Sequence, residues 1–143
     1  MVEYIKIDGK ILSVIVRNNY SEPGIHFFTG DNYSQQLAYM NHPKGKSIQP
    51  HVHNCIVRNV EYTQEVLFIK KGKLRVDFYD ENKIYCESRI LAEGDIILLA
   101  TGGHGFEVLE DIEMVEVKQG PYSGEGDKTR FNGVEKSKIN IIE

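Results

Sequence analysis

Apolar and polar residues alternate with a period of two along most of the chain, and Gly, Pro, Asn and Asp interrupt this alternation at short intervals. A period of two is typical of β-strands, because successive side chains point to opposite faces of a sheet. The alternation is clearest at residues 65–69 and 74–78, which Lys71-Gly72-Lys73 separates. No stretch shows the 3.6-residue period of a long amphipathic helix. The sequence therefore predicts an all-β protein.

The turn residues divide the chain into short strands. The predicted strands cover residues 2–7, 11–16, 25–28, 36–40, 65–70, 74–79, 83–91, 96–100, 104–109 and 113–118. Asp8-Gly9 and Lys71-Gly72-Lys73 are predicted to be hairpin turns. Many short strands with regularly spaced turns are typical of a β-sandwich or barrel.

No repeat or linker divides the 143 residues, so we predict a single domain. Its predicted parts are N-terminal strands in residues 1–34, a barrel core in residues 36–118 and a C-terminal tail in residues 121–143. The tail is polar and rich in glycine before its last few isoleucines. We expect it to wrap the surface or to fray.

Composition argues against several classes of partner. The formal net charge is −4 and no long run of Lys or Arg occurs, so we expect no nucleic-acid partner. No stretch approaches 18 consecutive apolar residues, and Glu3 and Lys6 interrupt the N-terminus, so we expect neither a membrane span nor a signal peptide. The two cysteines, Cys55 and Cys86, form no disulfide framework and are expected to be free thiols. A cytoplasmic location is the expectation.

A candidate metal site begins at His51 and His53. Residues two apart in a strand point the same way, so these two rings are predicted to lie side by side. Imidazole nitrogens that converge in this way suit a divalent metal ion. Two partly exposed histidines of a strand are the alternative that this pair alone leaves open.

Two further residues are predicted to point into the interior. Glu65 shares the phase of Leu67 and Ile69, and a buried carboxylate is costly unless it is paired or bound to a metal. His104 shares the phase of the apolar residues Phe106 and Val108. By the same alternation Glu107 faces away from His104.

The order and spacing of these residues resemble the cupin superfamily. Gly45, five residues, His51-x-His53, then Glu65, six residues and Gly72 resembles the first cupin motif, and residues 94–106 (GDIILLATGGHGF) resemble the second. The resemblance implies a double-stranded β-helix, which is a small jelly-roll barrel. It also implies that His51, His53, Glu65 and His104 bind one metal ion.

The chain departs from the family pattern between the two ligand groups. The family has three or four residues between the second histidine and the glutamate, whereas eleven separate His53 from Glu65. The inserted residues 54–64 are expected to lengthen a hairpin at the barrel mouth. They also offer Glu61, in the same strand phase as Glu65, and Gln64 as rival ligands. In the second motif Ala100 stands where the family usually has a proline.

The predicted ligand set does not select one metal. Three imidazoles and one carboxylate can hold Fe, Mn, Ni, Cu or Zn as the divalent ion. The resemblance implies a metal-dependent enzyme that acts on a small polar metabolite such as a sugar, sugar acid or keto acid, of the isomerase or dioxygenase type. A non-enzymatic barrel that binds or senses a small molecule or carbohydrate is the alternative.

Other residues are candidates for contact with a small-molecule substrate. The candidate proton-transfer groups are Tyr39, Cys55, Glu61 and Tyr62, and Arg58 is a candidate for binding a carboxylate or phosphate. Cupins commonly pair through their sheets, so the resemblance also implies a homodimer. The N-terminal hairpin of residues 2–16 is the expected interface segment.

Overall fold

The computed structural model describes all residues, 1–143, and contains no α-helix. Its strands are β1 (Val2–Ile7), β2 (Lys10–Val16), β3 (Gly24–Phe27), β4 (Ala38–Asn41), β5 (Glu65–Tyr79), β6 (Tyr85–Ala92), β7 (Ile96–Leu99) and β8 (Gly103–Lys118). Two short 3-10 helices follow, η1 (Gly124–Asp127) and η2 (Lys136–Lys138). None of its helices has the length and apolar character needed to cross a membrane. The prediction of an all-β protein is confirmed.

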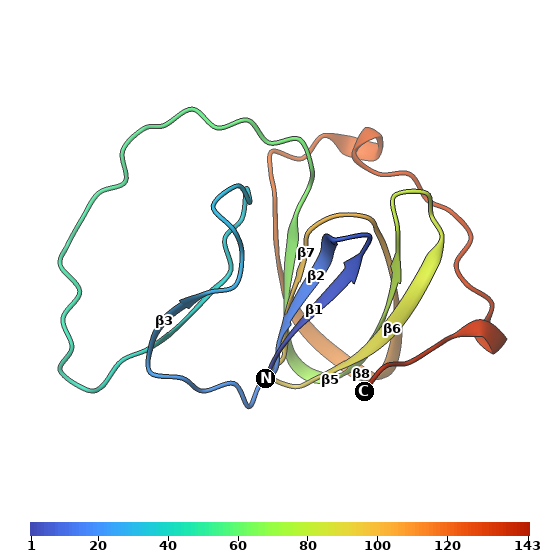
Figure 1. Cartoon of the computed structure of the whole chain (residues 1–143), viewed down its shortest axis with the longest axis horizontal. Coiled ribbons are helices and arrows are strands. Elements are labelled where there is room, and N and C mark those ends of the chain that lie inside the picture. Colours follow the sequence, from blue (N-terminus) through green and yellow to red (C-terminus); the bar gives the residue numbers. More distant parts are fainter. The chain divides into compact units, whose positions relative to one another are not determined.

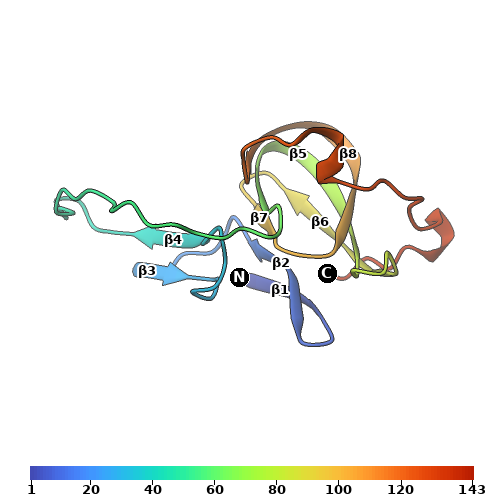
Figure 2. The same cartoon turned by 90° about the horizontal axis from the view of Figure 1, so that it is seen from above.

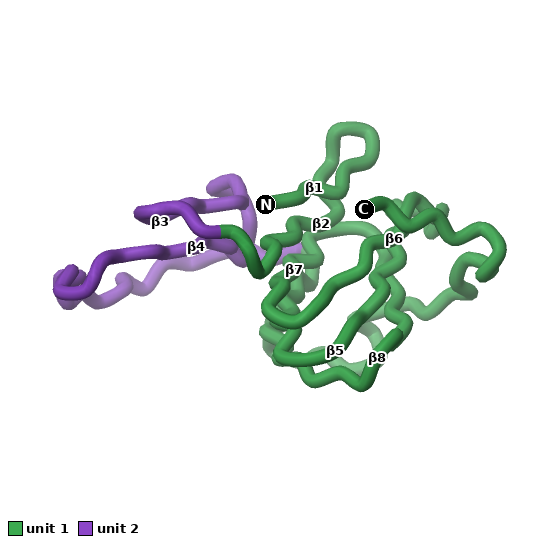
Figure 3. Tube along the Cα trace, turned by 90° about the horizontal axis from the view of Figure 1, so that it is seen from below, with its two compact units in different colours: residues 1–20, 62–143 green, residues 21–61 purple.

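The residues form two compact units, which Figure 3 shows in different colours. The first unit contains residues 1–20 and 62–143, and the second contains residues 21–61. The predicted division into residues 1–34, 36–118 and 121–143 of a single cupin domain stays a prediction.

The first unit is one strongly curled antiparallel sheet of six strands (Figures 1 and 2). The strand order is β1-β2-β7-β5-β6, and β8 pairs with β5. The hydrophobic core joins Ile5 of β1 to Leu91 of β6, which lie at opposite ends of this order. A sheet brings such residues into one cluster only by curling, so the core fills the inside of a half-barrel.

Strand β5 is continuous, although Lys71-Gly72-Lys73 predicted a hairpin turn. Gly72 has a φ of +87°, and a Cβ at this position would lie 2.1 Å from the carbonyl oxygen of Asp111. Gly72 therefore bends the strand where the backbone of β8 approaches closely, rather than reversing the chain. The hairpin prediction was wrong because both halves of β5 pair with the same strand, β8, with register shifts between Ile69 and Leu74.

Strand β8 is likewise one strand of 16 residues where the sequence predicted two. It pairs only with β5, so its other edge has no partner strand. Phe106 and Val108 lie directly across from the core residues Val76 and Leu74, yet their exposed fractions are 43% and 54%. The core-facing side of the half-barrel is thus open along β8.

The second unit contains the two-stranded sheet β3–β4. Ile25 pairs with Met40 and Phe27 with Ala38, so one face of this sheet is apolar, and Ile25, Phe27 and Met40 are exposed. Residues 42–64 belong to no strand, so the predicted strand at His51–His53 and the predicted hairpin over residues 54–64 are not present. A strand needs a neighbour for its backbone hydrogen bonds, and alternation along the sequence does not supply one.

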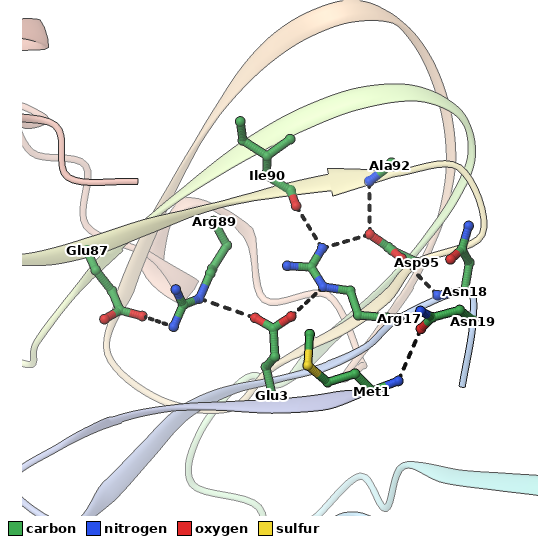
Figure 4. A network of polar contacts seen from close by, with 10 residues as sticks. All are labelled: Met1, Glu3, Arg17, Asn18, Asn19, Glu87, Arg89, Ile90, Ala92 and Asp95. Atoms are coloured by element: carbon green, nitrogen blue, oxygen red, sulfur yellow. Dashed lines mark hydrogen bonds and ion pairs between the residues drawn. The ribbon is translucent and has the colours of Figure 1, made fainter. Parts of the chain in front are cut away.

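A polar network fixes the first two strands to the turn between β6 and β7 (Figure 4). Arg17 donates to Glu3 Oε1 at 2.5 Å, to the Ile90 carbonyl at 2.7 Å and to Asp95 Oδ2 at 2.9 Å. The carboxylate of Asp95 also accepts the backbone N–H groups of Asn18 and Ala92. Asp95 is only 3% exposed, so this network compensates for the burial of its charge.

Candidate functional site

Glu65 is the buried carboxylate of the half-barrel. It begins β5 and lies in a cross-strand row with Ser13, Leu99 and Lys118. Its exposed fraction is 9%, in agreement with the phase that it shares with the core residue Leu67. Sequence phase therefore predicted its inward direction correctly.

His104 reaches Glu65 across the inside of the curled sheet. The backbone of His104 pairs with Phe78, near the far end of β5, while Glu65 is the first residue of that strand. Nevertheless His104 Nε2 lies 3.4 Å from Glu65 Oε2. Lys118 Nζ lies 2.8 Å from the other oxygen, Glu65 Oε1. Curling of β5 and β8 thus brings side chains from distant register positions together.

The environment of Glu65 favours its charged form. Hydrogen bonding by His104 lowers the pKa of Glu65 to about 2, with a further contribution from Lys118, although burial acts in the opposite direction. At neutral pH Glu65 is therefore an anion held between two nitrogen donors.

The sequence pattern predicted no role for Lys118. Lys118 ends the last predicted strand, but the residue that lies across from it is known only from the pairing of β8 with β5. Lys118 is about one-third exposed, and Glu65 in turn raises its pKa by hydrogen bonding. Register, which the sequence did not provide, makes it a neighbour of the carboxylate.

His51 and His53 lie in the second unit, in residues without regular structure. Their ring centroids are 5.2 Å apart and both residues are exposed. His51 Nδ1 donates to the Gln49 carbonyl oxygen at 3.0 Å, which leaves Nε2 with its lone pair. The two histidines are therefore neighbours, as predicted, but not through a strand.

The structure shows the four predicted ligands as two pairs, His51 with His53 and Glu65 with His104. No group of three or more His, Cys, Asp or Glu side chains is close enough to hold a metal ion. Of the two candidate carboxylates, Glu65 is the one that contacts His104, whereas Glu61 is an exposed residue of the second unit.

The other candidate residues lie mostly on the surface. Cys55, Arg58 and Tyr62 are exposed, and Tyr39 of β4 is half-buried. Glu107 forms an ion pair with Arg75, its cross-strand neighbour.

The Glu65–His104 pair has a geometry that fits a shared ion. Two ligand atoms that each lie about 2.1 Å from one metal are roughly 3.0–3.4 Å apart at octahedral or tetrahedral angles. The observed separation of 3.4 Å between Nε2 and Oε2 falls at the upper end of this range. Lys118 donates to Oε1, so Oε2 is the oxygen of Glu65 that faces His104.

No family model, curated protein or solved structure matches this chain.

Proposed function

We propose that this protein is a metal-binding barrel of the cupin type, in which His51, His53, Glu65 and His104 bind one divalent ion. The observation that carries the proposal is the contact between Glu65 and His104 on the core-facing side of the half-barrel. A buried carboxylate and an imidazole from separate strands converge there, and they are members of the ligand set that the cupin resemblance implies.

The free nitrogen of His51 supports its place in this set. Metal-binding histidines usually donate their second ring nitrogen to a carbonyl or carboxylate, which fixes the tautomer. The hydrogen bond from His51 Nδ1 to Gln49 has this form. Metal binding is commonly coupled to local folding, so the ion would order the segment that carries His51 and His53.

The unpaired edge of β8 supports the finer fold, a double-stranded β-helix. A long edge strand with exposed apolar side chains such as Phe106 and Val108 is normally covered. The strand-less residues 46–55 include His51 and His53 and have no partner strand. We propose that a further strand covers this edge of β8 in the double-stranded β-helix.

The proposed reaction acts on a small polar metabolite, such as a sugar, sugar acid or keto acid, in an isomerase or dioxygenase type of chemistry. The ion, Fe, Mn, Ni, Cu or Zn, would supply Lewis acidity towards substrate oxygens. Glu65 would offer one anionic oxygen, and Lys118 would keep the other oxygen occupied. Tyr39, Cys55, Glu61 and Tyr62 remain the proposed sources of a proton-transfer group.

A non-enzymatic barrel that binds or senses a small molecule or carbohydrate is the second candidate. Lys118 favours it, because Lys118 and His104 already satisfy both oxygens of Glu65 without a metal. In this case the Glu65 pairs are structural and the open face along β8 binds the ligand.

The deciding experiment is metal content by plasma mass spectrometry on tag-free protein, before and after incubation with Fe, Mn, Ni, Cu and Zn. A His51→Ala/His104→Ala variant is purified identically. His26→Ala is the matched control, since His26 lies outside the predicted set and bonds to the Pro23 carbonyl.

Near-stoichiometric metal that is lost only in the double variant supports the metal site and directs substrate screens to that ion. A parent protein that binds none of the five metals contradicts the proposal and leaves the metal-free binding barrel. Equal loss in the His26→Ala control would show that the bound metal is adventitious.

We also propose that this chain forms a homodimer in the cytoplasm. Its other partner would be a small-molecule ligand, and it would bind neither nucleic acid nor a membrane. Strand β1 pairs only with β2, so the hairpin has a free outer edge that a second copy can extend. Sedimentation velocity of the purified protein tests the dimer.

A further inference from the structure

The C-terminal residues 127–142, which we call the strap, cross the first unit in a fixed path. Thr63 donates to Asp127 Oδ1 at 2.9 Å beside the start of β5. At the other end, the backbone of Ser88 in β6 exchanges hydrogen bonds with Asn140 and Ile142. Figure 1 shows the strap in red, running from the end of β8 to β6. The predicted tail therefore wraps this unit.

The middle of the strap packs on the turn that precedes His104. A Cβ placed on Gly103 would lie 3.0 and 3.3 Å from ring carbons of Phe131. The same ring meets Tyr79 edge-on, with centroids 5.0 Å apart, and the Tyr79 hydroxyl accepts the N–H of Val134 at 2.9 Å. Phe131 thus occupies the space that a side chain at position 103 would take.

The other glycine of this turn lies against the backbone of β5. Gly102 has a φ of +71°, and a Cβ there would lie 2.5 Å from the Tyr79 carbonyl oxygen. The Gly102-Gly103 turn therefore packs against both Tyr79 and the ring of Phe131, with His104 as the next residue.

The imidazole of His104 has one polar contact and one ring contact. The structure gives it Glu65 at 3.4 Å and a tilted contact with Phe106 at 5.2 Å between centroids, and the side chain is 29% exposed. The direction of the imidazole also depends on where the backbone of residues 103–104 is held, by its pairing with β5 and by the packing of Phe131 on Gly103.

We propose that Phe131 is a positioning residue, and that the strap sets the orientation of His104 towards Glu65 by clamping the Gly102-Gly103 turn. The part of this inference that concerns metal affinity rests on the proposed function, whereas the part that concerns the orientation of His104 does not. The strap would thereby link the C-terminus to the site without touching its ligand.

The test compares Phe131→Ala with Tyr85→Phe in the full chain. The Tyr85 hydroxyl anchors the far end of the strap through Asn140. Removing this hydroxyl therefore weakens the strap but leaves Phe131 in place. The first readout is the His104 ring resonance of metal-free protein by NMR, assigned with His104→Gln. The second readout is Zn²⁺ affinity by calorimetry, and urea unfolding gives the stability of each variant.

We expect Phe131→Ala to move the His104 resonance towards its value in unfolded protein and to weaken Zn²⁺ binding about tenfold. Tyr85→Phe is expected to leave both unchanged, even if it lowers stability as much. In Phe131→Leu the His104 resonance should lie close to its wild-type position. A His104 resonance that is the same in wild type and Phe131→Ala, with both folded, overturns the proposal.

The two proposals fail separately. If wild type binds no Zn²⁺, the proposed function is at fault and the NMR comparison still decides the role of the strap. A reciprocal variant keeps the test informative if Phe131→Ala does not fold. Gly103→Ala should displace the Phe131 ring and shift the His104 resonance relative to wild type, and no shift in this variant would also contradict the clamp.

Discussion

Asp77 is a second buried acid whose protonation is expected to lower the stability of the fold. Arg75 donates to both of its oxygens, at 2.8 and 3.0 Å, and Ser88 donates to Oδ1 at 2.5 Å. Burial by itself raises the pKa of Asp77, but these hydrogen bonds and the charge of Arg75 outweigh it and lower the pKa below the usual value. The ionised form is therefore the one that stabilises the fold.

We predict that Asp77→Asn lowers the free energy of unfolding by about 2–4 kcal/mol at pH 7, because it breaks a buried ion pair. A lowered pKa means that the stabilisation is complete above about pH 4, the value in the unfolded chain, and is lost as the pH falls through the lower folded value. In urea unfolding between pH 7 and pH 3, the unfolding free energies of wild type and Asp77→Asn should approach each other as the pH falls. A constant difference across this range would contradict the prediction.

Arg17 is the central residue of the network in Figure 4. We predict that Arg17→Met costs about 3 kcal/mol of unfolding free energy, because Asp95 and Glu3 lose their compensating charge while Asp95 stays buried. Lys10→Met is the matched control, since Lys10 pairs with Glu81 on the surface and loss of such a screened pair should lower the unfolding free energy much less. Equal losses in urea unfolding would show that the network is not stabilising.

At the scale of elements, Gly72 decides whether β5 can bend against β8. We predict that Gly72→Ala costs at least about 2 kcal/mol more than Gly9→Ala. Both glycines have positive φ, +87° and +79°, so the backbone strain is similar. Only at Gly72 does the added Cβ meet another backbone, 2.1 Å from the Asp111 oxygen, while Gly9 has nothing within 4 Å.

Chemical denaturation of the two alanine variants, with circular dichroism as the probe, measures this difference. A similar loss at both positions would mean that strain alone, and not the approach of β8, makes glycine necessary at position 72. Because β8 also carries His104, a larger loss at position 72 would show that the bend contributes to the packing of the site strand.

At the scale of the whole molecule, the proposed site links the second unit to metal binding. Lys44, Lys46 and Arg58 are exposed trypsin sites on either side of His51 and His53. We predict that a bound divalent ion slows tryptic cleavage at these residues at least about fivefold, because ligation orders the segment between them. The His51→Ala/His104→Ala variant should show no metal-dependent protection. Protection that persists in this variant, or is absent in wild type, would contradict the four-ligand site.

The sequence by itself determined the all-β class and most strand positions. The period of two and the turn residues are local signals, and they located β1, β2, β6 and β7 to within a few residues. The same periodicity predicted that Glu65 points inward, because the side-chain direction along a strand needs no knowledge of its neighbours. It also identified His51 and His53 as a pair of adjacent rings.

Only the tertiary structure decided which strands lie next to each other. The residues around Gly72 predict a hairpin turn, but both halves of β5 pair with β8, so Gly72 forms a bend within one strand. Lys118 and Phe131 become neighbours of Glu65 and of Gly103 through register and through the path of the tail. Pairing and curl depend on contacts between residues far apart in sequence, so no local pattern specifies them.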